Sequence, residues 1–375
     1  MKVRHLLAAM ALLLSTGASA QEKAPTWINH VKLSGYGMVQ YQASDKTDAK
    51  ANSFNLRLAR ISLDGRILND FYWKAQIQIN GNTSQLGSSP RVVDLFAEWQ
   101  KYTYFRVKAG QFKRPFTFEN PMHPIEQGFM GYSQIINNIA GFTDRAGGHS
   151  SNGRDIGVQV QGDLLPNASG RNLLHYQVGV FNGQGINVSD VDQQKDLIGG
   201  LWLMPVKGMR IGAFGWTGSY ARKYSWRDEA NVTHNEICRL PQRRYAFSAD
   251  YVVNDWTFRT EYAHSTGLAF KNRYQNPSDA NDITLSNYGD KAQGVYALVI
   301  APIIKNHLHA KARYDMYQPS GDASKQKTQY ELGLDYVFSY NLKLSGEYAR
   351  INDRSINNPD KHNYNLVDVQ LSFRF

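Results

Sequence analysis

Apolar and polar residues alternate along much of this chain. In the last eleven residues, Val367, Val369, Leu371 and Phe373 fall on one face, and polar residues stand between them. A period of two with unlike faces predicts a β-strand that separates two unlike environments. About sixteen segments of this kind can be placed, at residues 31–42, 54–67, 71–80, 91–100, 103–111, 154–164, 172–182, 196–206, 208–220, 243–253, 255–266, 291–302, 306–317, 327–339, 341–351 and 363–375.

The connections between these segments alternate between short and long. Short ones lie at 68–70, 254–255, 305–306 and 340–341, and long ones at 43–53, 81–90, 112–153, 183–195, 221–242, 267–290, 318–326 and 352–362. Short turns at one end and long loops at the other are typical of outer-membrane barrels. The expected fold is therefore all-β, a 16-stranded antiparallel transmembrane β-barrel. An even strand number places both chain ends on the short-turn side and requires 363–375 to pair with 31–42, because an open edge in lipid leaves backbone groups unsatisfied.

The N-terminus has the features of a secretory signal. Lys2 and Arg4 precede an apolar stretch, and Ala18-Ser19-Ala20 is a small-residue cleavage site. We expect residues 1–20 to be a signal peptide cut after Ala20, and residues 21–375 to be one barrel domain. Removing the signal lowers the formal net charge from +10 to +8. No later run of about eighteen apolar residues exists, and the mean hydropathy is −0.49, which disfavours membrane-spanning helices.

Four stretches carry a resemblance to a known family. Residues 108–119 read KAGQFKRPFTFE, residues 154–160 read RDIGVQV and residues 178–185 read VGVFNGQG, with LARISLDG at 58–65 as a looser match. These stretches resemble the phosphate-selective porin O and P family. The terminal Phe375 is also similar to the assembly signal of bacterial outer-membrane barrels. The resemblance implies a homotrimeric outer-membrane porin whose third long loop folds into the pore, with a preference for anions such as phosphate.

Residues 112–153 form the third and longest of the predicted long loops. Loops of this length are uncommon in compact domains unless they are functional. The segment combines Lys113, Arg114 and Arg145 with acidic residues. We expect it to constrict the pore, with these three side chains near the narrowest point, where charge determines which ions pass. A surface flap is the alternative for this loop.

The polar faces of the strands supply further pore-lining candidates. The predicted anion-binding set contains, besides the three loop residues, Arg60, Lys74, Arg106 and Lys108. Other basic residues on these faces are Arg244, Arg259, Lys311, Arg313 and Lys343. Acidic residues are about as numerous, among them Asp94, Asp155, Glu261, Asp315, Glu331, Asp335 and Glu347. Each charge has a second interpretation as part of an ion pair that braces the barrel wall.

These observations predict a passive diffusion channel for small hydrophilic solutes with a preference for anions such as phosphate. Its expected partners are two further copies of the chain and the lipid and lipopolysaccharide of the outer membrane. Segments 196–206 and 291–302 carry apolar residues on both faces, which makes them candidate subunit contacts. A non-conducting barrel that acts as a surface receptor or adhesin is the alternative, because it shares the same strand pattern.

Other function classes find little support in the sequence. An enzyme needs a positioned nucleophile and base, and only scattered pairs such as His149-Ser150 and His264-Ser265 are present, without a Gly-x-Ser-x-Gly elbow. His307 and His309 lack further metal ligands nearby, so neither a metal site nor a cofactor is expected. A basic cluster for nucleic acid is also missing. The single cysteine, Cys238, is interpreted as an incidental loop thiol.

Overall fold

The computed structural model describes residues 28–47, 51–80, 90–141, 151–270, 283–287 and 289–375. The expected signal peptide and its cleavage site lie outside the described residues. Sixteen strands form the barrel: β1 (Ile28–Ser44), β2 (Ala51–Ile67), β3 (Phe71–Gln78), β4 (Arg91–Tyr102), β5 (Phe105–Lys113), β6 (Arg154–Pro166), β7 (Asn172–Phe181), β8 (Asp196–Leu203), β9 (Met209–Arg227), β10 (Thr233–Val253), β11 (Trp256–Thr266), β14 (Ala292–Ile304), β15 (Leu308–Gln318), β16 (Lys327–Ser339), β17 (Leu342–Asp353) and β18 (Asn363–Arg374).

Short elements lie in the connections of the barrel. They are helix α2 (Gln134–Asn138), the two-residue strands β12 (Ala269–Phe270) and β13 (Leu285–Ser286), which pair with each other, and the 3₁₀ turns η3 (Ala323–Lys325) and η4 (Pro359–Lys361). Among the described residues, no helix has the length and apolar character needed to cross a membrane.

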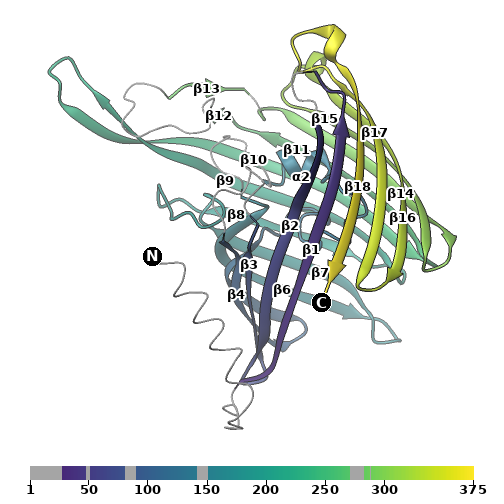
Figure 1. Ribbon diagram of the computed structural model, residues 1–375. Helices are drawn as coiled ribbons and strands as arrows, with labels where there is room; N and C mark the ends of the chain where they lie inside the picture. Colours follow the sequence, from purple (N-terminus) through teal and green to yellow (C-terminus); the bar gives the residue numbers. More distant parts are fainter. Residues whose placement is uncertain (1–27, 48–50, 81–89, 142–150, 271–282, 288) are drawn as a thin grey trace, which may run out of the picture.

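The sixteen strands close into an antiparallel barrel in which each strand pairs with its neighbours in sequence (Figure 1). The closing contact joins β1 to β18 in a register from Tyr36 opposite Arg374 to Ser44 opposite Leu366. Gly35 and Phe375 extend it by exchanging two backbone hydrogen bonds, both 3.0 Å long. The predicted fold class and the predicted pairing of the first and last segments are therefore confirmed.

The alternation of side chains follows the two faces of the barrel wall. In β16, Tyr330, Leu332 and Leu334 are 58%, 62% and 52% exposed on the outer face, whereas Glu331 and Asp335 are 7% and 5% exposed on the inner face. An apolar outer face with a polar inner face is the pattern that lipid and an aqueous interior impose on a barrel strand.

One predicted loop is instead a strand pair. The segment 221–242, expected to be a long loop, continues β9 and β10 into a hairpin whose turn is closed by a hydrogen bond from Asp228 N–H to Val232 O, 3.1 Å long. In Figure 1 this hairpin projects beyond the neighbouring strands. The stacked rings of Trp226 and His234, with centroids 4.5 Å apart, help to hold it. Its residues do not separate into one apolar and one polar face, and the sequence pattern therefore missed it.

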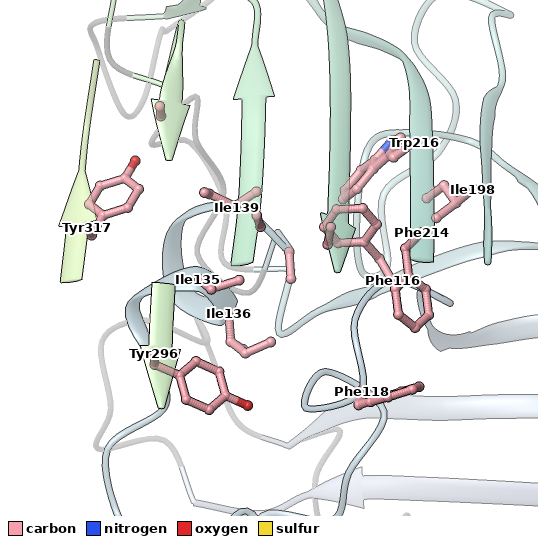
Figure 2. Packing of buried hydrophobic residues seen from close by; sticks show 14 of the residues in the cluster. Phe116, Phe118, Ile135, Ile136, Ile139, Ile198, Phe214, Trp216, Tyr296 and Tyr317 are labelled. Carbon is pink, nitrogen blue, oxygen red and sulfur yellow. The ribbon is translucent and has the colours of Figure 1, made fainter. Parts of the chain in front are cut away.

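The largest apolar cluster joins the connection between β5 and β6 to several strands. This connection, residues 114–153, is called the long loop below. Its Phe116, Phe118 and Ile135 are at most 2% exposed and belong to one cluster with Phe214 of β9 and Tyr296 of β14. Figure 2 shows the isoleucines of α2 between Tyr296 and Tyr317 on one side and the Phe214–Trp216 region on the other.

The assignment of the outer face of the barrel to lipid can be tested on β16. We expect Leu332→Arg, near the middle of β16, to lower the free energy of unfolding by about 2–4 kcal/mol, because it places a charge in lipid. The same change at Gln329, which lies on the inner face of the same strand, should have a much smaller effect. Urea unfolding of the barrel in vesicles measures both variants. Equal losses would contradict the assignment of the two faces.

Candidate functional site

Carboxylates from distant strands hold the backbone of the long loop. Glu261 of β11 accepts hydrogen bonds from the N–H groups of Phe118 and Glu119 at 2.7 and 3.0 Å. Glu347 of β17 accepts from the N–H of Met130 at 2.9 Å. Buried backbone groups need such partners, and the loop has little regular structure to supply them. The strands therefore fix the path of the loop.

Basic side chains of β10, β11, β15 and β17 bind carbonyl groups of the loop. The contacts are Arg244 Nη1 to Ile139 O (2.7 Å), Arg259 Nη1 to Gln127 O (3.0 Å), Lys311 Nζ to Gly128 O (2.8 Å), Arg313 Nη1 to Gly131 O (3.0 Å) and Lys343 Nζ to Ile125 O (3.1 Å). Hydrogen bonds with a charged partner are roughly twice as strong as neutral ones. The wall from β10 to β17 thus holds the loop through both donors and acceptors.

The charges on this wall also pair with one another. The Lys311 ammonium lies 2.6 Å from Asp335 and 2.5 Å from Glu347, and Lys343 lies 3.4 Å from Asp335. Arg313 forms an ion pair with Glu331. Cations and carboxylates therefore compensate each other where the loop is attached, which is the bracing role considered for these residues from the sequence.

Helix α2 docks the middle of the loop. The Ser133 hydroxyl caps the helix by accepting a hydrogen bond from Ile136 N–H at 3.3 Å, as N-cap serines do. The Gln134 N–H donates to Asp315 of β15 at 2.9 Å. Ile135 and Ile136 are fully buried beside β14 and β15 (Figure 2). One face of this short helix is therefore apolar, and its first turn is held by a wall carboxylate.

A cavity of about 300 Å³ lies on the opposite side of the loop, between residues 121–124 and strands β1 to β6. Its charged lining consists of five basic side chains and one carboxylate, namely Arg60, Lys74, Lys108, Lys113, Arg154 and Asp94. Arg154 binds Asp94 with contacts of 2.6 and 3.1 Å, so that the one carboxylate is already compensated. The remaining balance of the lining is strongly positive.

A second cavity, of about 340 Å³, adjoins the first. Both are lined by Tyr36, Lys74, Gln76 and His123. The second also contacts the short connection between β16 and β17, at Tyr340 and Asn341, and the final residues Arg374 and Phe375. The two cavities together follow the inner wall from the long loop to the short-turn end of the barrel.

Three strand residues of the predicted anion-binding set meet in the first cavity. Arg60 donates to Gln78 Oε1 at 3.0 Å and to the Tyr36 hydroxyl at 3.0 Å. Lys108 lies 3.6 Å from Glu98. For Lys74, no hydrogen bond or ion pair closer than 4 Å is found with any described residue.

The two adjacent loop candidates lie on different sides. Lys113 lines the first cavity and donates to Met122 O at 2.6 Å. Arg114 instead binds Asp155 through two nitrogens, at 3.2 and 2.8 Å, and lies over the Trp216 ring at 4.8 Å. It also donates hydrogen bonds to the Ser151 hydroxyl and the Gly141 carbonyl. It thereby joins the two parts of the loop that the structure describes, 114–141 and 151–153.

The other two members of the predicted set are placed elsewhere or not described. Arg106 forms an ion pair with Asp163 at 2.8 Å, and it lines neither of the two cavities. Arg145 lies outside the described residues.

Residues that the predicted set omits also line the two cavities. They are Arg154 in the first cavity, Lys32 and Arg374 in the second, and His123 in both. Lys32 and Arg374 stand on the polar faces of the first and last strands. The predicted pairing of these two strands could therefore have identified both residues as part of one wall. Burial and the nearby Lys113 and Lys74 cations lower the pKa of His123 to about 3, which keeps its imidazole neutral at physiological pH.

Comparison with known proteins places this barrel among the porins. Residues 33–190, from β1 to the connection after β7, match the family model described as phosphate-selective porin O and P. Over these residues the chain is similar to this porin family. The recognition made from the sequence is thereby confirmed, and with it the expectations of an outer-membrane barrel and of a protein that is not an enzyme.

Solved structures support the fold of this porin along nearly its whole length. OmpT of Vibrio cholerae, in a variant lacking loop L8, has a TM-score of 0.60 at 11% identity and covers 92% of this chain and 99% of its own. The outer-membrane channel DcaP of Acinetobacter baumannii gives 0.59 at 14%, covering 95% and 100%. OmpF of Salmonella typhi gives 0.60 at 14%, covering 92% and 98%. No curated protein sequence matches the porin.

The ion network that holds the long loop can be tested at Lys311. We expect Lys311→Met to destabilise the porin by roughly 3 kcal/mol, because it leaves Glu347 and Asp335 buried with fewer cations. It should also make residues 125–131 more sensitive to protease. Lys305→Met, at an exposed position between β14 and β15, is the matched control. Heat-modified mobility on gels and limited proteolysis measure both effects. Unchanged protection of the loop would contradict this role.

The lowered pKa of His123 predicts a pH dependence of stability. In the unfolded chain its imidazole takes up a proton near pH 6.5, whereas in the folded porin it does so only near pH 3. The unfolded state therefore binds more protons between these values, and stability should fall by up to about 1.4 kcal/mol per pH unit as the pH drops. His123→Gln should lose this contribution, whereas His307→Gln, at an exposed position, should keep it. Urea unfolding at pH 7 and pH 4 compares the three proteins.

Proposed function

We propose that this porin is a passive diffusion channel that prefers anions such as phosphate, and that its long loop lies in the pore and narrows it. The observation that carries the proposal is the cavity lined by five basic side chains and one carboxylate beside residues 121–124 of the loop. The description of the matched family, phosphate-selective porin O and P, points in the same direction.

The position proposed for the loop is supported by its partners. The hydrogen-bonded side chains come from the inner faces of β10, β11, β15 and β17, and Arg374 of β18 forms an ion pair with Glu126 at 3.1 Å. A loop bound to so much of the inner wall crosses the interior and leaves its passage on the β1–β6 side. In this arrangement Lys74 and Lys113 border the narrowest part of the pore.

The proposed selectivity is electrostatic. Low-dielectric walls focus the field of fixed charges in a narrow passage, and uncompensated cations there raise the local concentration of anions. On the opposite wall the cations are paired with carboxylates or bind loop carbonyls, and their fields largely cancel. Of the predicted set, Arg60, Lys74, Lys108 and Lys113 act directly on the solute, and Arg114 acts by fixing the ends of the loop. We leave Arg145 in the set as a candidate.

The proposed assembly is a homotrimer in the outer membrane. One of the similar structures, OmpT of Vibrio cholerae, is described in a trimer form. The apolar outer face, for example Leu197, Leu201 and Leu203 of β8, about half exposed, would contact lipid, lipopolysaccharide or a neighbouring copy. We further propose that residues 1–20 are removed after Ala20 during export.

Ion selectivity tests this function. In planar bilayers with a potassium chloride gradient, we expect a reversal potential that reports anion preference. Lys74→Gln and Lys113→Gln should each lower the anion-to-cation permeability ratio roughly fivefold, which corresponds to about 1 kcal/mol, the interaction of unit charges about 4 Å apart in water. Arg106→Gln, a basic residue paired outside the two cavities, is the control and should change little. Cation preference of the unmodified porin would refute the proposal.

A further inference from the structure

The first cavity has an apolar wall that a channel for inorganic anions does not need. Tyr72, Phe96 and Phe112 contribute rings from β3, β4 and β5, and the long loop contributes Pro121 and Met122. The Tyr72 and Phe96 ring centroids are 6.0 Å apart, and those of Phe96 and Phe112 are 5.9 Å apart. The three rings therefore form one continuous band beside the cavity.

The cations of the cavity lie next to this band. The Lys108 ammonium is 5.0 Å from the Phe96 ring centroid and 5.3 Å from that of Phe112. Lys74 stands two residues from Tyr72 on the same face of β3, and Lys113 follows Phe112 directly in the chain. A solute in the cavity thus meets positive charge and aromatic surface at the same time.

These two features together select a kind of anion. A compact inorganic anion such as phosphate gains from the cations but has no apolar surface to bury against the rings. An anion with an apolar body gains from both, and burial of apolar surface contributes about 25 cal/mol per Å². Small-molecule sites are typically cavities of about 300–1,000 Å³ with mostly apolar walls and a few polar groups that fix orientation. A cavity of about 300 Å³ is at the lower end of this range.

We propose that this cavity is a binding site for small aromatic carboxylates, which it holds with the carboxylate near Lys74 and Lys113 and the ring against Tyr72 and Phe96. The proposal rests on the proposed anion channel and narrows its substrate class. It does not require that inorganic anions be excluded, because the same cations attract them. It does require that a ring strengthen binding beyond what the charge alone provides.

Block of the chloride current in single-channel recordings tests this site with benzoate, acetate and inorganic phosphate as probes. Benzoate and acetate carry the same charged group, so that the ratio of their half-block concentrations measures what the ring contributes to binding. We expect half-block by benzoate at a concentration roughly tenfold below that for acetate, which corresponds to about 1.4 kcal/mol. Phosphate should also require a higher concentration than benzoate. Equal half-block by benzoate and acetate would overturn the proposal, while an anion-selective reversal potential would leave the proposed channel intact.

Variants of Tyr72 and Lys74 separate ring from charge. Tyr72→Ser should raise the half-block concentration of benzoate several-fold and leave that of acetate unchanged, whereas Tyr72→Phe, which keeps the ring, should behave like the unmodified porin. Lys74→Gln should raise the half-block concentrations of benzoate and acetate by the same factor. If Tyr72→Ser does not fold, Met122→Ser removes apolar lining from the loop side. It should also lower the ratio of the acetate half-block concentration to the benzoate half-block concentration. A ratio unaffected by both serine variants would also overturn the proposal.

Discussion

Backbone hydrogen bonding across the whole wall is the constraint on which this structure depends. Lipid offers no partner for an N–H or C=O group, so a membrane sheet must close on itself. The pairing of β1 with β18, from Tyr36 opposite Arg374 to Ser44 opposite Leu366, provides this closure. Closure also fixes which side chains point inward on every strand. It thereby brings residues from the two ends of the chain, such as Lys32 and Arg374, to the wall of one cavity.

The interior divides into two walls with different charge chemistry. From β10 to β17, carboxylates such as Glu261 and Glu347 form hydrogen bonds with the long loop. Cations such as Lys311 form ion pairs with these carboxylates and also bind the loop. From β1 to β6, basic side chains exceed carboxylates around an open cavity. The formal net charge of +10 for the whole chain says nothing about this division. In the proposed channel, an anion would respond to the excess of basic side chains next to it, and this excess lies on the β1–β6 side.

The sequence predicted the barrel well because period two is a local signal that lipid enforces on every strand. It failed at the hairpin of 221–242, which projects beyond the neighbouring strands and whose two faces do not differ in polarity. Period two also placed Arg60, Lys74 and Lys108 on inward faces, and all three line the first cavity. It could not tell which cations would be neutralised. Arg114 is adjacent to Lys113 in the chain, yet its carboxylate partner, Asp155, is 41 residues away.

The mixed lining of the first cavity follows from how the long loop is attached. A loop bound by its backbone to one wall is free to present its side chains to the other, and Met122 and Pro121 do so here. The β3–β5 wall must then provide rings as well as cations to pack beside them. Apolar surface next to an uncompensated ammonium lowers the local dielectric and strengthens the attraction of that ammonium for an anion. In the proposed channel, the aromatic band would therefore act on charged solutes even where it touches none of their charged atoms.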